Sequence, residues 1–250
     1  MKFFEFNGQQ IIFRNHGETV VVEPWGPDSL RVRAVLMGDV RDDRFALLDP
    51  VDSPDVELTL VDDDHAILRN GKITAKVNPE GWISYYNQKG ELLTEEYWRN
   101  RNRINRYSVS LRIPARELKC IPGTNDFALS ARFEAFDDEM IFGMGQYQDK
   151  HLNKKGATLE LCHRNSQASV PFFVSSRGYG FLWNNPAIGT ATFGTNRTEW
   201  TARSTKKLDY YITCGDTPAE IEYNYTAATG RTPMMPEYGM GYWQCKLRYR

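Results

Sequence analysis

Few residues in this sequence have the spacing that marks a catalytic or metal site. The four histidines are scattered along the chain, at His16, His65, His151 and His163. The four cysteines lack the CxxC spacing of zinc and redox sites and stand far apart, at Cys120, Cys162, Cys214 and Cys245. The FGMGQ stretch at residues 142–146 lacks the third glycine and the following helix of a dinucleotide site. Neither a G-x-S-x-G elbow nor a phosphate-binding loop occurs. We therefore expect no metal and no cofactor.

Carboxylates could still do acid–base work on a sugar, but such a pair meets only in three dimensions and cannot be found by spacing.

The charge balance argues against nucleic acid and anionic lipid as partners. The 31 basic and 32 acidic side chains give a net charge of −1, so no overall field would draw the chain to nucleic acid or anionic lipid. The one basic run, residues 97–107, follows Glu95 and Glu96, which partly neutralise it.

The composition, with 41% hydrophobic and 25% charged residues, is typical of a globular chain. No stretch approaches the roughly 18 apolar residues of a membrane span, and the first residues lack the apolar core of a signal peptide. We expect no membrane partner, a cytoplasmic location and free thiols.

Short β-rich runs separated by turn residues dominate the chain, for example at residues 17–26, 28–38 and 126–136. Residues 65–96 predict an antiparallel meander, in which Asn70-Gly71 suits a type I′ turn and two further turns fall at 78–81 and 87–90. Residues 103–113 alternate in the same way and predict another strand.

Residues 217–230 predict one helix. Thr217 can cap it, Pro218 suits its first position, Glu220 completes a capping box and Gly230 can end it. The two prolines that follow, Pro233 and Pro236, indicate a boundary between domains at 1–232 and 233–250.

Three motifs in order, FGMGQ at 142–146, VPFFVSSRGYGFLWNNP at 170–186 and the run from Leu208 to Tyr249, resemble the family 31 glycoside hydrolases, which include α-glucosidases and α-xylosidases. The resemblance implies a mainly β fold: a galactose-mutarotase-like antiparallel β-sandwich, followed by the first strand of a (β/α)8 barrel. It also implies retaining hydrolysis of a terminal α-linked glucose or xylose by two barrel aspartates, whose carboxyl groups lie about 5 to 5.5 Å apart.

Residues 238–249 match the family's first barrel strand, and a complete barrel takes about 250 residues. The rest of the barrel is therefore missing from this sequence. We expect no catalytic residue in it, no hydrolysis by it alone, and the catalytic barrel of the same protein as its partner. An α-glucoside or α-xyloside would be the small-molecule substrate, and the sequence leaves open the choice of sugar and any homo-oligomer.

The resemblance implies three substrate-binding residues. Tyr249 matches the aromatic residue that ends the first barrel strand and lines the sugar pocket. Arg164 and Asn165 match an Arg-Asp pair on a sandwich loop that reaches over the barrel, where the aspartate accepts hydrogen bonds from sugar hydroxyls. Because the amide of Asn165 is uncharged, its hydrogen bonds would be weaker, which puts the usual glucose specificity in doubt.

Three other residues attract attention. Gln146 stands where relatives commonly carry glutamate, and we expect it to stabilise its loop. Trp183 and Trp200 could serve as sugar platforms, but large aromatic residues in a sandwich are usually core, and we expect them there.

The alternative is a free-standing carbohydrate-binding sandwich without an enzyme. That hypothesis predicts that the last strand joins the sandwich and leaves no exposed apolar edge. An aldose mutarotase is a weaker third hypothesis, since it would need a histidine and glutamate constellation that no motif supports.

Overall fold

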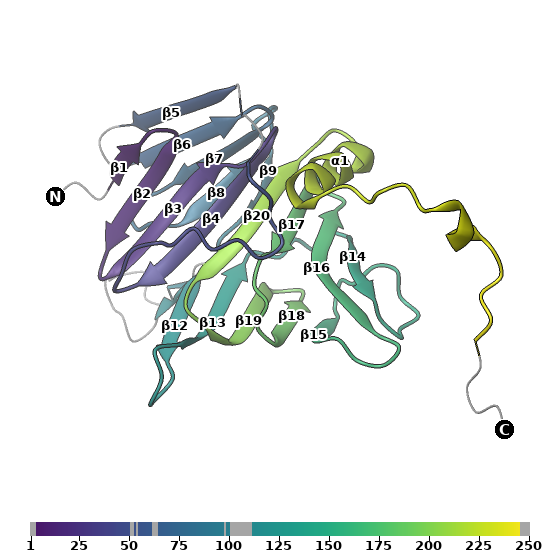
Figure 1. Ribbon diagram of the computed structural model, residues 1–250. Helices are drawn as coiled ribbons and strands as arrows, with labels where there is room; N and C mark the ends of the chain where they lie inside the picture. The colour runs from purple at the N-terminus through teal and green to yellow at the C-terminus, as the bar shows by residue number, and fades with distance from the viewer. Residues whose placement is uncertain are drawn as a thin grey trace.

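Strands dominate the computed structural model, which describes residues 4–50, 53, 55–61, 65–97, 99–100 and 112–245 (Figure 1). The largest sheet has eight strands, and each neighbouring pair is antiparallel. Their order is β1 Phe4–Asn7, β2 Gln10–Asn15, β3 Glu18–Pro24, β4 Ser29–Leu36, β20 Leu208–Cys214, β17 Tyr179–Trp183, β16 Ala168–Ser175 and β14 Ile141–Gln146.

Two five-stranded sheets form the second layer. The first is a meander of β5 Val56–Val61, β6 His65–Asn70, β7 Ile73–Val77, β8 Ile83–Tyr86 and β9 Leu92–Glu95. The second has the order β12 Arg116–Cys120, β13 Phe127–Phe133, β19 Thr198–Thr205, β18 Gly189–Phe193 and β15 Thr158–Leu161. The bridge between Glu96 and Phe133 joins the two sheets.

Side chains from all three sheets meet in one core, as the alternating pattern of the strands predicts. Tyr85 of the meander reaches Tyr210 of the eight-stranded sheet through a 2.6 Å contact between their hydroxyls. Phe133 of the other small sheet packs edge-on against Phe181, with ring centroids 5.2 Å apart. The molecule is therefore the antiparallel sandwich that the sequence predicts, and Trp183 and Trp200 lie fully buried in its core, as expected.

The meander forms with its turns at 78–81 and 87–90 as predicted, but its first turn lies one residue further along. Asn70 pairs with Ile73, so the two loop residues are Gly71 and Lys72. Of these only Gly71 has a positive φ, whereas a type I′ turn needs two such residues. The cause is the buried amide of Asn70, which donates hydrogen bonds of 2.7 Å to the carbonyls of Gly26 and Ser29 and so keeps Asn70 in the strand.

The predicted helix is α1, Pro218–Thr229, and it covers the outer face of the eight-stranded sheet (Figure 1). Thr217 Oγ1 accepts from the backbone N–H of Glu220 at 3.3 Å, which confirms the N-cap. Glu220 does not complete the reciprocal box; its Oε2 accepts from the N–H of Asp216 at 3.0 Å. Ile221 packs into a second apolar cluster, and the ring of Tyr225 stacks on Phe172 at 3.7 Å.

Two predicted strands have different outcomes. Most of 103–113 lies outside the described residues; its end forms β11, Arg112–Ile113, which pairs with β10, Arg99–Asn100. The expected strand at 238–249 is not formed in its described part, since Glu237–Met240 is a 3-10 helix and 241–245 are irregular. A strand needs a neighbour for its backbone hydrogen bonds, and no strand in the described part of the chain pairs with this segment.

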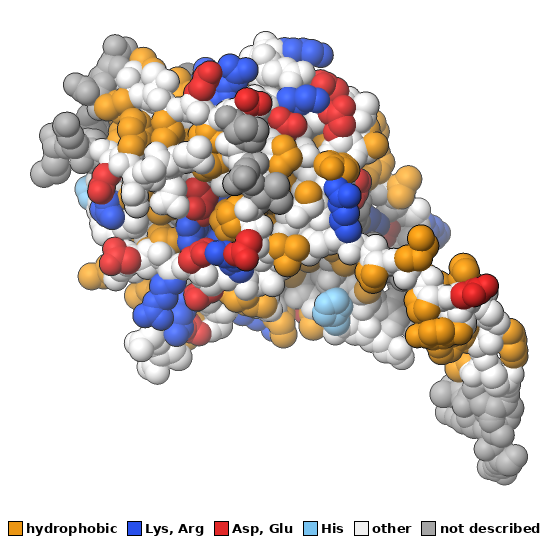
Figure 2. All heavy atoms as spheres, turned by 45° about the horizontal axis from the view of Figure 1, so that its top comes forward, with side chains coloured by type: hydrophobic (Ala, Val, Ile, Leu, Met, Phe, Trp, Pro, Cys, Tyr) orange, Lys and Arg blue, Asp and Glu red, His pale blue; other side chains and the backbone are white. Residues whose placement is uncertain are grey.

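Residues 231–245 instead extend away from the sandwich as a tail (Figure 1). Hydrophobic side chains gather along this tail in Figure 2, and they include Met234, Tyr238, Tyr242 and Trp243. Each is at least 69% exposed. The alternative hypothesis of a free-standing binding module predicts the opposite, a last segment absorbed into the sandwich.

Candidate functional site

The loop at 162–167 carries two of the predicted substrate-binding residues. It links β15 at the edge of one sheet to β16 in the other layer. Arg164 and Gln167 exchange backbone hydrogen bonds of 3.2 and 3.1 Å, so Asn165 and Ser166 form a tight turn between them. Ser166 has a φ of 65° in that turn. The loop is therefore ordered by its own backbone, with Asn165 at its tip.

Arg164 and Asn165 are adjacent and exposed, as a substrate-contacting loop requires. The guanidinium of Arg164, 57% exposed, forms an ion pair with Glu160 at the end of β15. A second arginine, Arg203, lies 3.7 Å from the other oxygen of Glu160. Arg164 is thus paired with Glu160 on the strand before the loop, while Asn165 and Ser166 present polar groups at the exposed tip.

The strand β14 has an irregular backbone and pairs with β16, the strand that follows this loop. Gly143 pairs with Phe173 and Gly145 with Ser169, so the register of β14 against β16 shifts between these pairs. Gly143, Met144 and Gly145 all have positive φ. This is the FGMGQ motif, and Gln146 at its end is exposed and pairs with Ala168. The role that the sequence suggested for Gln146, loop stabilisation, stays a prediction.

Gly145 cannot carry a side chain at this place. A Cβ atom there would lie 2.3 Å from the carbonyl oxygen of Ala168, on backbone with a φ of +89°. Gly156 has nearly the same φ, +87°, but has no atom within 4 Å of the Cβ position. We expect Gly156→Ala to cost about 1 to 2 kcal/mol of unfolding free energy from backbone strain alone, and Gly145→Ala to cost clearly more.

Urea unfolding of the two variants checks this prediction. Because the two glycines have nearly the same positive φ, the difference between them mainly measures the contact with β16. Equal losses would mean that β14 and β16 do not hold each other as the structure shows.

The third predicted residue, Tyr249, lies outside the described residues. The structure therefore places Arg164 and Asn165 together and leaves the position of Tyr249 a prediction. Sequence reasoning missed Tyr147 and Glu160: Tyr147 bonds to the carbonyl of Glu160 and to Ser169, and Glu160 pairs with Arg164. The one available signal was that Tyr147 directly follows the FGMGQ motif.

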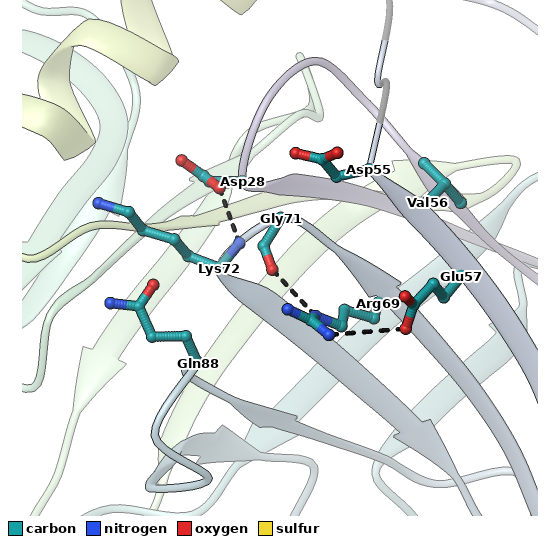
Figure 3. Close-up of a pocket in the computed structure, with 8 residues that line it drawn as sticks. All are labelled: Asp28, Asp55, Val56, Glu57, Arg69, Gly71, Lys72 and Gln88. Carbon is teal, nitrogen blue, oxygen red and sulfur yellow. Dashed lines mark hydrogen bonds and ion pairs between the residues drawn. The ribbon is translucent and has the colours of Figure 1, made fainter.

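An open hollow of about 670 Å³ lies elsewhere, near the turn between β6 and β7 (Figure 3). Its lining is mainly polar, and several of its groups bond to one another. The backbone N–H of Lys72 donates to Asp28 at 2.7 Å, and the guanidinium of Arg69 lies 3.6 Å from Glu57. The described residues that line it include no aromatic side chain. We assign no ligand to this hollow.

Two carboxylates do approach each other beside this hollow, but they are not an acid–base pair. Lys72 Nζ donates to Asp216 at 2.8 Å and to Glu220 at 2.6 Å. These hydrogen bonds from Lys72 lower the pKa of both carboxyl groups. A retaining glycosidase needs one carboxyl group that stays protonated as the acid, and here both are held ionised. The cluster anchors the start of α1.

Burial raises the pKa of the Glu96 carboxyl group, but its position excludes a role in hydrolysis. Glu96 lies between the sheets, 5% exposed, and is ion-paired with Arg116. A substrate could not reach it. The described residues hold no cluster of three or more His, Cys, Asp or Glu suited to a metal ion, and no helix among them has the length and apolar character needed to span a membrane.

Comparison with known proteins decides the family. The model of the glycosyl hydrolase 31 N-terminal galactose mutarotase-like domain matches residues 19–190. The chain belongs to glycoside hydrolase family 31. It carries the N-terminal domain of that family, which confirms the resemblance found in the motifs.

Curated relatives agree with this family assignment. An uncharacterized family 31 glucosidase, ORF2, of Pseudescherichia vulneris is 47% identical over 249 residues, and α-xylosidase A of Aspergillus niger is 32% identical over 272 residues. These matches cover 96% and 99% of this chain. The chain spans only 46% of the length of the first relative and 35% of the second.

Solved structures of the family share the fold. A family 31 α-xylosidase from a soil metagenome, solved with xylose, has a TM-score of 0.93 and 50% identity, and the match covers 99% of this chain and 37% of that one. A xylosidase from Aspergillus niger has a TM-score of 0.82 and 28% identity, over 96% of this chain and 35% of that one. The sandwich of this chain is therefore the family's N-terminal β domain.

Proposed function

We propose that this chain is the N-terminal part of a retaining α-glycosidase that releases terminal α-linked xylose or glucose, with xylose preferred. The observation that carries the proposal is the 50% identity, at a TM-score of 0.93, to an α-xylosidase solved with xylose. The name of a second relative, the α-xylosidase of Aspergillus niger, supports the same sugar.

In this proposal the sandwich supports the barrel and lends it the 162–167 loop. The two catalytic aspartates that the family resemblance implies would lie in the part of the relatives that this chain does not span, so we expect no hydrolysis by this part alone. The exposed apolar tail supports this division, because side chains such as Trp243 would pack against the barrel. Residues 1–232 then form the sandwich domain, and 233–250 lead into the barrel, where Tyr249 would line the sugar pocket.

Asn165 is proposed to meet a hydroxyl of the terminal sugar. An amide can donate and accept but makes no charge-assisted hydrogen bond. A neutral contact suits a site that does not need to bind the hydroxymethyl group that glucose has and xylose lacks.

The cytoplasmic location stays part of the proposal. It is supported by the cysteines, which occur as free thiols, as they do in a reducing compartment.

The test uses the longer protein with p-nitrophenyl α-xyloside and p-nitrophenyl α-glucoside. We expect a higher kcat/KM for the xyloside, and proton NMR should show the α-anomer as the first product, because two displacements retain the configuration. Release of the β-anomer first, or turnover of β-linked substrates alone, would contradict the proposal.

Asn165→Asp tests the role of the loop. Xylose and glucose share their ring hydroxyls, and a charged acceptor strengthens a hydroxyl contact by about 1 kcal/mol, so we expect kcat/KM for both sugars to rise about fivefold. Asn165→Ala is the control and should lower kcat/KM for both sugars. Values of kcat/KM that are unchanged for both sugars in both variants would remove Asn165 from the substrate site.

A further inference from the structure

One tyrosine outside the 162–167 loop bonds to both of its stems, which are the end of β15 before the loop and the start of β16 after it. Tyr147 follows directly on β14, and its hydroxyl donates to the carbonyl oxygen of Glu160 on β15 at 3.0 Å. The same hydroxyl lies 2.8 Å from Ser169 Oγ on β16. A phenolic hydroxyl has one hydrogen and free lone pairs, so it can donate to the carbonyl and accept from the serine at the same time.

The sheets themselves do not fix the distance between these stems. β15 pairs with β18 in one layer, and β16 pairs with β14 and β17 in the other. Inside the loop, Gln167 Nε2 donates to the carbonyl of Cys162 at 3.0 Å, and the N–H of Ser169 donates to His163 Nδ1 at 3.3 Å. Tyr147 adds a contact that reaches both stems from the body of the sandwich.

Tyr147 is well placed to serve as a fixed point. Its ring is partly buried and packs against the main core, while the following residue, Gln148, is exposed. Burial raises the pKa of its hydroxyl, which therefore remains a donor at neutral pH. Removing the hydroxyl would leave the ring in place and remove its contacts with the two stems.

We propose that Tyr147 is a positioning residue: by bonding to Glu160 and Ser169 it holds the 162–167 loop so that Asn165 meets the substrate at a fixed place. This inference rests on the proposed function, in which Asn165 contacts the sugar. A neutral amide contact depends on geometry, because an error of about 1 Å in placement can cost a hydrogen bond's whole contribution.

The test compares Tyr147→Phe with the wild type in the longer protein. Tyr223→Phe is the matched control, because Tyr223 is 56% exposed on α1 and far in sequence from the loop. Ser169→Ala keeps the ring of Tyr147 and removes one of its two partners, so it serves as a milder variant if Tyr147→Phe fails to fold. Melting temperatures of all variants are measured first.

The first readout does not depend on catalysis. Trypsin cleaves after arginine, so the rate of cleavage after Arg164, followed by mass spectrometry, reports how often the loop opens. We expect about fivefold faster cleavage in Tyr147→Phe, a smaller increase in Ser169→Ala and no change in Tyr223→Phe.

The second readout is kinetic. We expect the KM for the preferred sugar to rise about fivefold in Tyr147→Phe with kcat unchanged, since the lost contact would bind ground state and transition state alike. Cleavage as slow as in Tyr223→Phe would overturn the proposal, and so would faster cleavage with an unchanged KM. If the wild type turns over neither sugar, the proposed function fails, while the cleavage rates still decide whether Tyr147 holds the loop.

Discussion

Replacing Asp209 by alanine should lower the free energy of unfolding by about 3 to 5 kcal/mol. Asp209 lies on β20 and is fully buried with Arg31 of β4, whose Nε and Nη2 donate to it at 3.0 and 2.7 Å. Lys207 Nζ lies 3.3 Å from the same carboxylate and is itself 4% exposed. Without Asp209, Arg31 keeps Asp42 as a partner and Lys207 keeps the carbonyl of Asp43, so the cost of holding two buried cations away from water is only partly offset.

The control for this variant is Glu5→Ala. Glu5 pairs with Arg14 at the surface, where both side chains are at least half exposed and water screens the pair. Denaturant unfolding of both variants gives the comparison. A loss for Asp209→Ala no larger than for Glu5→Ala would mean that the buried pair does not form.

Trp200→Ala should lower the free energy of unfolding by about 3 to 5 kcal/mol through the cavity it leaves. Trp200 is fully buried, and its ring stacks on Phe181 and Trp183 with centroids 5.3 and 5.6 Å apart. Phe193 meets the same ring edge-on at 5.8 Å. The contacts with Phe181 and Trp183 on β17 join the two layers of the sandwich.

Trp243→Ala is the matched control, because Trp243 on the tail is 69% exposed and its removal creates no cavity. We expect its effect on the unfolding midpoint of the 250-residue chain to be small. Both variants are compared by thermal unfolding. Equal stability of the two variants would mean that Trp200 is not a core residue, and the alternative role of a sugar platform would then have to be considered again.

The sequence predicted those parts of the fold that local chemistry decides. Alternating strands, the turns at 78–81 and 87–90 and the Thr217 cap all depend on neighbouring residues, and all three are found. The turn after β6 was misplaced by one residue, because the amide of Asn70 bonds to carbonyls 44 and 41 residues away. Contacts of that range leave no local pattern.

The candidate site shows the same division. The motifs identified the loop and its residues Arg164 and Asn165, but not what holds the loop in place. Tyr147 meets Glu160 and Ser169 only because β14, β15 and β16 converge from two layers. The pair of Arg31 and Asp209, 178 residues apart, was invisible for the same reason.

Hydrolysis of p-nitrophenyl α-xyloside by residues 1–250 and by the longer protein, at equal concentration, tests the central claim most directly. Near-ultraviolet circular dichroism first shows that both are folded. We expect release of nitrophenol by the longer protein and none above the buffer rate by residues 1–250, because the proposed function places the catalytic aspartates outside this part. Turnover by residues 1–250 would contradict that placement.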